Sequence, residues 1–253
     1  AADLARIYPD PPPEKDAARF LGPVLAQLRM PKDEILQQVP LFGPIPFPRG
    51  SASLDNPVRA IVEQILETNR PALLAAQHVD LDGTWFATGL SKGFTNVSNP
   101  PLHPLMDLAR LLCLDATLRA ERQDGPGAVG SLLRTLQIGK TCRSPVVIRE
   151  LSGKVTENCA CLALERVLNQ TALSENELEL LASATTDQGG AGIRRILSGE
   201  RMVGLYIFES YGNMATQLLN RARSPVSYLW TKQTLRRLTS DEDLLRYLEW
   251  EDQ

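Results

Sequence analysis

The sequence predicts an all-α protein, an irregular helical bundle or a short α-array of antiparallel helix pairs. Apolar residues recur at three- and four-residue spacing from residue 103 to residue 249, and this spacing places them on one face of a helix. Short breaks that contain helix-start residues separate these stretches, as in antiparallel helices joined by tight turns.

The first part of the chain is rich in proline, so we distinguish an N-terminal segment, residues 1–53, from a helical body, residues 54–253. We expect the segment to pack on the body as part of one continuous domain. Prolines and glycines at 11–13 and 40–50 are incompatible with helix. Between them, residues 14–30 are predicted to be helical, and residues 32–38 form a short turn.

The helical body is expected to begin at Asp55, which has the character of an N-cap and precedes a proline at the first helical turn. This helix is predicted to run to about residue 79. Glycines, asparagines and prolines then indicate a long loop at 80–103, with a short stretch of strand at 84–88. The loop carries too much apolar surface to remain in water, so we expect it to pack across the body as one wall of a ligand groove. Trp85 and Phe86 are its candidate groove residues.

The later helices follow closely on one another. Helices are predicted at 104–122 and 126–143, and another begins at Ser144, with an apolar stripe formed by Ile148, Leu151, Val155, Cys159 and Leu162. Ser174 and Glu177 have the spacing of a capping box. A long helix is predicted at 192–221, a further one from residue 224, and a last one capped by Thr239 or Ser240.

The composition excludes some classes of function. Lys+Arg 27 against Asp+Glu 30 gives a net charge of -3, so no basic field favours nucleic acid as a partner. No apolar stretch approaches the ~20 residues of a membrane helix, so no membrane insertion is expected within this chain. The four cysteines are expected to be free thiols. In a hairpin of helices, Cys113 lies level with about residue 135 instead of Cys142, and Cys159 and Cys161 point to nearly opposite faces.

Three short motifs imitate known sites. Residues 125–130 match the dinucleotide pattern GxGxxG, but a charged helix precedes them instead of a strand, so we interpret them as a turn. Residues 139–141 lack the first glycine of a phosphate loop, because Arg134 occupies its position. Asp80 and Asp82 resemble the start of a calcium loop, but its last position is Gly89 instead of glutamate. No cofactor and no metal site are therefore expected.

Three titratable residues remain as candidates. His78 and His103 are the two histidines of the chain and flank the same loop. A shared metal or acid–base role competes with the ordinary packing of a histidine at a helix end. Glu200 lies in the middle of the apolar stripe of helix 192–221 and is expected to be buried and paired. It either fixes the helix in an ion pair, with Arg194, Arg195 or an arginine of another helix, or acts as a tuned acid or ligand anchor.

Several soft, Leu- and Ala-rich motifs resemble a group of bacterial all-helical proteins of unknown function that lie outside the cytoplasm behind an N-terminal membrane segment. They occur at residues 11–14, 67–70, 102–105, 107–112 and 198–201. The helix pairs are also similar to tetratricopeptide proteins in length and loop style, although no fixed repeat or consensus is present. The resemblance covers most of the chain and bears on fold and compartment only. It implies an extracytoplasmic location, periplasmic or in the cell envelope, with an anchor or signal before residue 1.

The leading hypothesis from the sequence is a non-enzymatic helical module that binds a protein or peptide in a groove between helix pairs. Its candidate groove residues are His78, Asp80, Asp82, Trp85, Phe86, His103 and Glu200. The alternative is a hydrolase-like enzyme or small-ligand-binding protein that assembles acid–base groups from His78, His103 and Glu200, with Asp80 and Asp82 as further candidates. A structural envelope protein without a ligand is the third hypothesis. Convergence of both histidines and Glu200 on one cleft would favour the enzyme.

Overall fold

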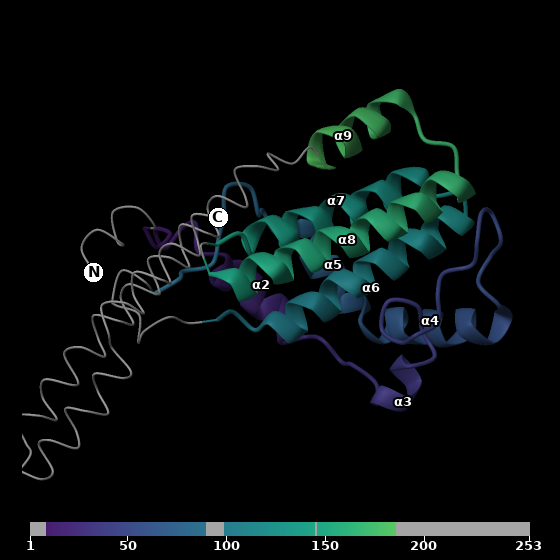
Figure 1. The fold of residues 1–253 in the computed structure, drawn as a ribbon, viewed down its shortest axis with the longest axis horizontal. Coiled ribbons are helices and arrows are strands. Elements are labelled where there is room, and N and C mark those ends of the chain that lie inside the picture. The colour runs from purple at the N-terminus through teal and green to yellow at the C-terminus, as the bar shows by residue number, and fades with distance from the viewer. Residues whose placement is uncertain (1–8, 90–98, 145, 186–253) are drawn as a thin grey trace, which may run out of the picture.

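The computed structural model of the chain describes residues 9–89, 99–144 and 146–185 (Figure 1). These residues are all-helical, and their β-pairing consists of a single bridge between Asp16 and Trp85. The all-α prediction is therefore confirmed for the part of the chain described. The helices predicted at 192–221, from 224 and after 239, together with Glu200, lie outside the described residues.

Three long helices that pack against one another form the centre of the fold: α6 (Leu102–Glu121), α7 (Gly125–Thr141) and α8 (Val147–Gln170). Their axes lie side by side in Figure 1. The Sγ atom of Cys113 on α6 lies 3.9 Å from Oγ1 of Thr135 on α7, which confirms the level predicted for this cysteine. All four cysteines are free, and Cys161 alone among them is exposed.

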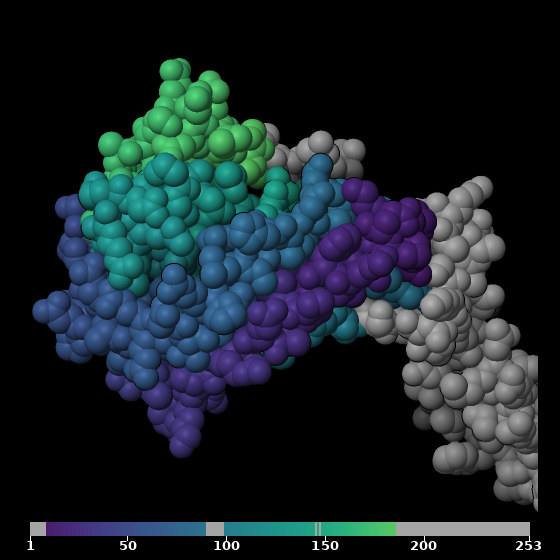
Figure 2. Space-filling model, turned by 180° about the vertical axis from the view of Figure 1, so that it is seen from behind, coloured from purple at the N-terminus to yellow at the C-terminus, as the bar shows by residue number. Residues whose placement is uncertain are grey.

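Smaller helices cover the central layer on two sides. α2 (Ala17–Leu25) packs against α5 (Arg70–His78) and α6, and α4 (Asn56–Thr68) packs against the same two helices. Figure 2 shows the purple N-terminal residues lying beside the blue residues of this layer. The short helix α3 (Asp33–Leu36) precedes α4, and α9 (Glu175–Thr185) packs on α7 at the other side.

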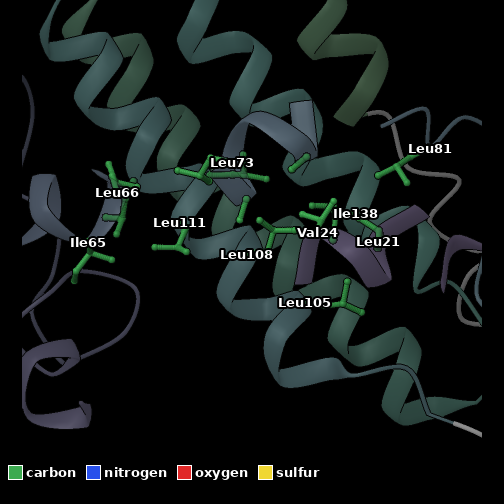
Figure 3. Close-up of a cluster of buried hydrophobic side chains, with 14 of the residues drawn as sticks. Leu21, Val24, Ile65, Leu66, Leu73, Leu81, Leu105, Leu108, Leu111 and Ile138 are labelled. Atoms are coloured by element: carbon green, nitrogen blue, oxygen red, sulfur yellow. The ribbon is translucent and has the colours of Figure 1, made fainter. Parts of the chain in front are cut away.

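Helix α6 is the centre of the hydrophobic core. One apolar cluster joins its leucines to α2, α4, α5 and Ile138 of α7, as Figure 3 shows for Leu21, Val24 and Leu108. A second cluster, which contains Cys113 and Ala116 of α6, fills the space between α6, α7, α8 and α9. The buried residues of α6 face both layers, while charged residues such as Asp115 and Arg119 stay partly exposed.

The first two predicted helices differ from the observed ones. The helix predicted at 14–30 begins after Asp16, whose carboxylate accepts from the N–H of Ala18 at 3.0 Å, and ends at Leu25. The helix predicted at 55–79 is divided into α4 and α5 at Asn69. The buried Asn69 side chain accepts from the backbone N–H of Arg29 at 2.7 Å and donates to the carbonyl of Arg29 at 3.0 Å. These tertiary hydrogen bonds join the non-helical chain that follows Leu25 to the break between α4 and α5 at Asn69, and they hold both in place.

The first described part of the loop predicted at 80–103, residues 80–89, contains no strand beyond the bridge of Trp85. The N–H of Trp85 donates to the carbonyl of Lys15 at 3.1 Å, and Trp85 accepts from the N–H of Ala17 at 3.1 Å. Phe86 and Leu81 are each 4% exposed and belong to the core cluster of α2, α5 and α6. This half of the loop thus packs against the body.

Helix α8 buries a different face from the one that its apolar pattern indicated. Helix α8 packs against α6 and α7, and its buried residues include, together with Cys159 and Val167, several small or polar ones: Ser152, Thr156, Ala160 and Ala163. The larger side chains of Ile148, Leu151, Val155 and Leu162 are 42% to 52% exposed. The spacing of the apolar residues predicted a helix here correctly, but it did not predict which face of the helix is buried.

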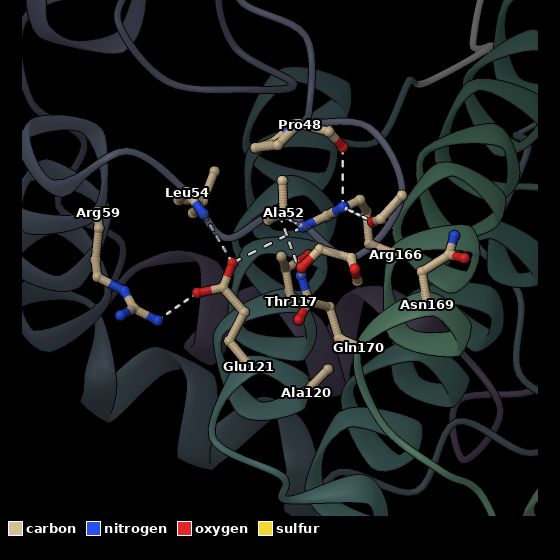
Figure 4. A network of polar contacts seen from close by, with 12 residues as sticks. Pro48, Ala52, Leu54, Arg59, Thr117, Ala120, Glu121, Arg166, Asn169 and Gln170 are labelled. Carbon is tan, nitrogen blue, oxygen red and sulfur yellow. Dashed lines mark hydrogen bonds and ion pairs between the residues drawn. The ribbon is translucent and has the colours of Figure 1, made fainter.

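A buried polar network fastens the N-terminal segment to α6 and α8 (Figure 4). Glu121, whose side chain is 1% exposed, pairs with Arg59 and accepts from the N–H of Leu54 at 2.9 Å. The guanidinium of Arg166 donates to the carbonyls of Pro48 (2.9 Å), Gly50 and Ala52 (2.5 Å), and it lies 3.9 Å from Glu121. Burial lowers the pKa of Arg166, and the nearby carboxylate of Glu121 opposes that shift.

Candidate functional site

A cavity of about 490 Å³ lies between α4 and α5 on one side and the C-terminal half of α6 on the other. We call it the α4–α6 groove. Helix α4 contributes Glu63, Leu66 and Glu67 to its lining. Helix α5 contributes Arg70, Leu73, Leu74 and Gln77 on the same side, and the opposite wall is formed by Asp115, Leu118, Arg119, Arg122 and Asp124.

The floor of the groove is made of leucines. Leu66, Leu73 and Leu118 are between 3% and 9% exposed, so they belong mainly to the core. Leu74 differs, because 45% of it remains exposed at the groove. An accessible leucine next to a leucine floor offers an apolar contact for one large side chain of a ligand.

The rim of the groove carries charges of both signs, and these charges pair with one another. Arg122 and Glu63 form an ion pair of 2.8 Å between α6 and α4, with side chains 62% and 43% exposed. Arg119 pairs at 2.8 Å with both Asp115 and Asp124. Exposed pairs such as Arg122–Glu63 contribute about 0–1 kcal/mol to stability, so a ligand can replace that pair at little energetic cost.

Arg119 is the most firmly held of these side chains. Partial burial works against its charged form, but hydrogen bonds and ion pairs with Asp115 and Asp124 outweigh that effect and raise the pKa of the guanidinium. Asp115 in turn accepts from the hydroxyl of Ser131 on α7 at 2.6 Å. The orientation of Arg119 is therefore fixed before any ligand arrives, which lowers the entropic cost of binding.

A second cavity of about 340 Å³ lies between α3 and α4, where Ile35, Ile61 and Ile65 form an apolar wall. Its lining contains Arg29 as a charged side chain and otherwise Met30, Pro31, Gln38, Gln64 and Thr68. This cavity has less polar surface to select a partner than the α4–α6 groove.

The sequence-based candidates at the start of the loop are exposed. His78 ends α5, and Asp80 accepts from the N–H of Asp82 at 3.0 Å in a tight turn before Gly83. The carbonyl of Asp82 accepts from the ammonium of Lys15 at 3.0 Å. The fragment that imitates a calcium loop is thus a turn between α5 and the loop.

None of the described candidates lines the α4–α6 groove or the cavity between α3 and α4. His103 is exposed in the first turn of α6. Trp85 is half-buried beside the N-terminal segment, Phe86 is in the core, and Glu200 lies outside the described residues. Within the described ranges, no three His, Cys, Asp or Glu side chains meet as a metal site.

Two of the motifs that imitate known sites, residues 125–130 and residues 139–141, lie in helix α7. The GxGxxG match at 125–130 forms its first turns, after Asp124 accepts from the N–H of Gly127 at 3.0 Å as an N-cap. Residues 139–141 form its last turn. Both motifs are therefore parts of one capped helix, with no strand before it among the described residues.

The α4–α6 groove was not predicted from the sequence. A signal for it exists: Glu63, Glu67 and Arg70 recur at three- and four-residue spacing, as do Asp115, Arg119 and Arg122. If each set lay on a single helix, it would place its charges on one face, although Arg70 in fact begins α5. Such a pattern is typical of an ordinary solvated surface. That α4 and α6 face each other is decided by the tertiary fold.

Comparison with known proteins does not narrow the function further, because no family model, curated protein or solved structure matches the chain.

In the described parts of the chain, no helix combines the length and the apolar character that crossing a membrane requires.

Proposed function

We propose that the protein is a binding module that holds a segment of another protein in the α4–α6 groove. The observation that carries this proposal is the half-exposed Leu74 on a leucine floor between two charged helix faces. An apolar centre within a polar rim is the usual composition of a protein interface. The resemblance noted in the sequence supports an extracytoplasmic location for this binding.

The proposed ligand is a peptide that presents one large apolar side chain to Leu74 and charged groups to the rim. Arg122 and Glu63 are both exposed by more than a third and lie on opposite walls, so a ligand with charges of both signs can replace their mutual ion pair. Charge complementarity of this kind contributes mainly to selectivity and association rate, while the apolar contact contributes to affinity.

Selection from a peptide library displayed on phage tests the proposal, with the full chain as bait. The enriched peptides are expected to bind the Leu74→Glu variant about tenfold or more weakly, equivalent to ~1.4 kcal/mol, because a carboxylate enters the apolar floor. Leu180→Glu on α9 is the matched control, since Leu180 is 52% exposed and outside the groove. Enriched peptides that bind Leu74→Glu with unchanged affinity, or no enrichment at all, would contradict the proposal.

A further inference from the structure

Helix α8 has an exposed apolar face that we call the α8 stripe: Ile148, Leu151, Val155, Leu162 and Leu168. Each of these residues is 42% to 52% exposed. The opposite face of α8 packs against α6 and α7, and Figure 1 shows α8 on the near side of the central layer, with no other described helix in front of it. Contiguous apolar patches on the order of a few hundred Å² are uncommon on soluble monomers and mark sites of protein association.

The spacing of the α8 stripe indicates that another helix covers it. Its first positions are separated by three and four residues, and the same alternation adds the exposed Asn158 between Val155 and Leu162. A repeat of about 3.5 residues is the seam along which two helices pack in a coiled coil. From Ile148 to Leu168 the stripe extends ~30 Å along the helix axis, so it can contact one partner helix over nearly the full length of α8.

The polar residue of the seam fits a second copy of the same helix. The Asn158 amide needs a hydrogen-bond partner once it is covered. Because an amide carries both donors and an acceptor, Asn158 of one copy can bond to Asn158 of another across a two-fold axis. A single asparagine of this kind fixes the register of coiled coils. A wholly apolar ligand would instead leave the amide without a partner, which is costly.

The charges beside the α8 stripe are also self-complementary. The Lys154 side chain is 40% exposed and pairs with Glu157 at 2.9 Å, and the exposed Glu165 lies about three helical turns further along. Lys154 and Glu165 therefore flank the seam on the same side. In an antiparallel pair whose two-fold axis passes between residues 159 and 160, Lys154 of each copy lies level with Glu165 of the other. A parallel pair would place each charge level with its own copy, which repels.

The size of the face suits a weak dimer. The smallest specific interfaces take about 600 Å² from each partner. The apolar residues of the stripe supply on the order of a few hundred Å² of this area, and the polar residues along it add further contact. Residues of the segment 41–49 adjoin the stripe, because they form a groove of about 400 Å³ together with Leu162. Interfaces at this lower limit associate weakly, so we expect a dissociation constant of roughly 1–100 μM.

We propose that two copies of the chain associate through their α8 stripes, as antiparallel helices related by this two-fold axis. The apolar residues of each stripe then cover those of the other copy. The two Asn158 amides bond to each other near the axis, and Lys154 of each copy pairs with Glu165 of the other. The interface is separate from the α4–α6 groove, whose lining contains no residue of α8, so the dimer goes beyond the peptide binding proposed there.

Sedimentation velocity of the full chain tests the association. Over a concentration series of ~5–200 μM the parent is expected to become mainly dimeric. Val155→Glu should weaken the dimer at least about tenfold, because a carboxylate enters the apolar seam. Leu180→Glu on α9 is the matched control, since Leu180 is 52% exposed and lies outside the stripe. Both substitutions are at exposed positions, and circular dichroism of each variant verifies its helical content.

Charge reversal at low salt tests the antiparallel arrangement. Lys154→Glu and Glu165→Lys should each weaken the dimer about threefold to tenfold, because each places like charges level with one another at two symmetry-related sites. The double variant Lys154→Glu/Glu165→Lys should return the dissociation constant to within about twofold of the parent. A double variant as weak as the single ones would overturn the proposal, as would a parent that stays monomeric or a dimer that Leu180→Glu dissociates equally well. None of these readouts depends on peptide binding in the α4–α6 groove.

Discussion

Glu121 and Arg166 are charged side chains that the fold removes almost completely from water, with 1% and 4% of the side chain exposed. Taking an isolated charge out of water costs several kcal/mol, so such groups need hydrogen-bonding partners. Glu121 has Arg59 and the N–H of Leu54, and Arg166 has three carbonyls of the N-terminal segment. The two residues stabilise the fold by holding chain segments together, and their removal would leave the partners uncompensated.

Replacement of Glu121 by alanine is predicted to lower the free energy of unfolding by about 3–5 kcal/mol, the usual effect of removing one partner from a buried ion pair. Chemical denaturation monitored by circular dichroism measures this change. Glu67→Ala is the control, because Glu67 forms an ion pair whose side chains are 72% and 66% exposed, and we expect a change below about 1 kcal/mol there. If the two substitutions changed the free energy of unfolding equally, the burial of Glu121 would not be the cause of its effect.

The sequence pointed to Glu200 as the buried carboxylate because Glu200 interrupts an apolar stripe. Glu121 gives no such signal, since it closes the charged end of α6 beside Arg119 and Arg122. Its burial arises because residues 48–54 pass over this end and are anchored there by Arg166. Contacts between residues so far apart in the chain cannot be inferred from local spacing.

At the scale of the elements, α7 and α8 approach each other closely at two glycines. A Cβ atom added to Gly153 would lie 2.8 Å from the carbonyl oxygen of Gly139, and one added to Gly139 would lie 3.1 Å from the carbonyl of Gly153. Real side chains are not tolerated at such distances from backbone atoms without a shift of the helices. The absence of side chains at these two positions therefore sets the separation of α7 and α8.

The variant Gly153→Ala is predicted to destabilise the protein by about 1–3 kcal/mol through overpacking. Gly130→Ala provides the matched control on α7, since nothing lies within 4 Å of its added Cβ. Alanine is the better helix former by about 0.5–1 kcal/mol, so this control is expected to stabilise the protein. Thermal melts of both variants compare the two effects, and a stabilising Gly153→Ala would refute the close contact.

The start and end signals of several helices could be read from the sequence. Ser174 and Glu177 form the predicted capping box, in which the Ser174 N–H and hydroxyl donate to the Glu177 carboxylate at 2.7 Å and 2.8 Å. Asp124 caps α7. These signals are local hydrogen bonds between neighbouring residues, so they require no knowledge of the rest of the fold. The break at Asn69 depends instead on Arg29, which lies in the segment between α2 and α3.

At the scale of the whole molecule, the N-terminal segment is held to the body by contacts at both of its ends. Near its start, residues 15 and 17 pair with Trp85, and Asp10 accepts from the N–H of Thr88 at 2.7 Å. Near its end, Arg166 and Gln170 of α8 donate to carbonyls of residues 48–52. Prolines at 11–13 and at 44, 46 and 48 keep these two ends out of helix, so the contacts with the body satisfy their backbone groups and hold them in place.

Replacement of Arg166 by lysine is predicted to loosen residues 48–52 without unfolding the helices, because an ammonium cannot contact three carbonyls as the planar guanidinium does. Trypsin should then cleave after the exposed Arg49 about tenfold faster, which corresponds to ~1.4 kcal/mol of local opening free energy. Mass spectrometry of the early fragments measures the rate. In the control Arg122→Lys, an exposed residue of the groove rim is changed, and cleavage after Arg49 should keep the rate of the parent.

The sequence by itself determined that the described chain is helical, where several helices begin, and that Cys113 lies level with Thr135. These properties follow from interactions within one helix or between neighbouring helices, which local spacing and capping residues encode. Only the tertiary structure decided which face of α8 is buried, where the helix after Asp55 breaks, and that Glu63 and Arg122 face each other across a groove. These depend on contacts between residues distant in the chain, and each apolar or charged pattern is compatible with more than one such arrangement.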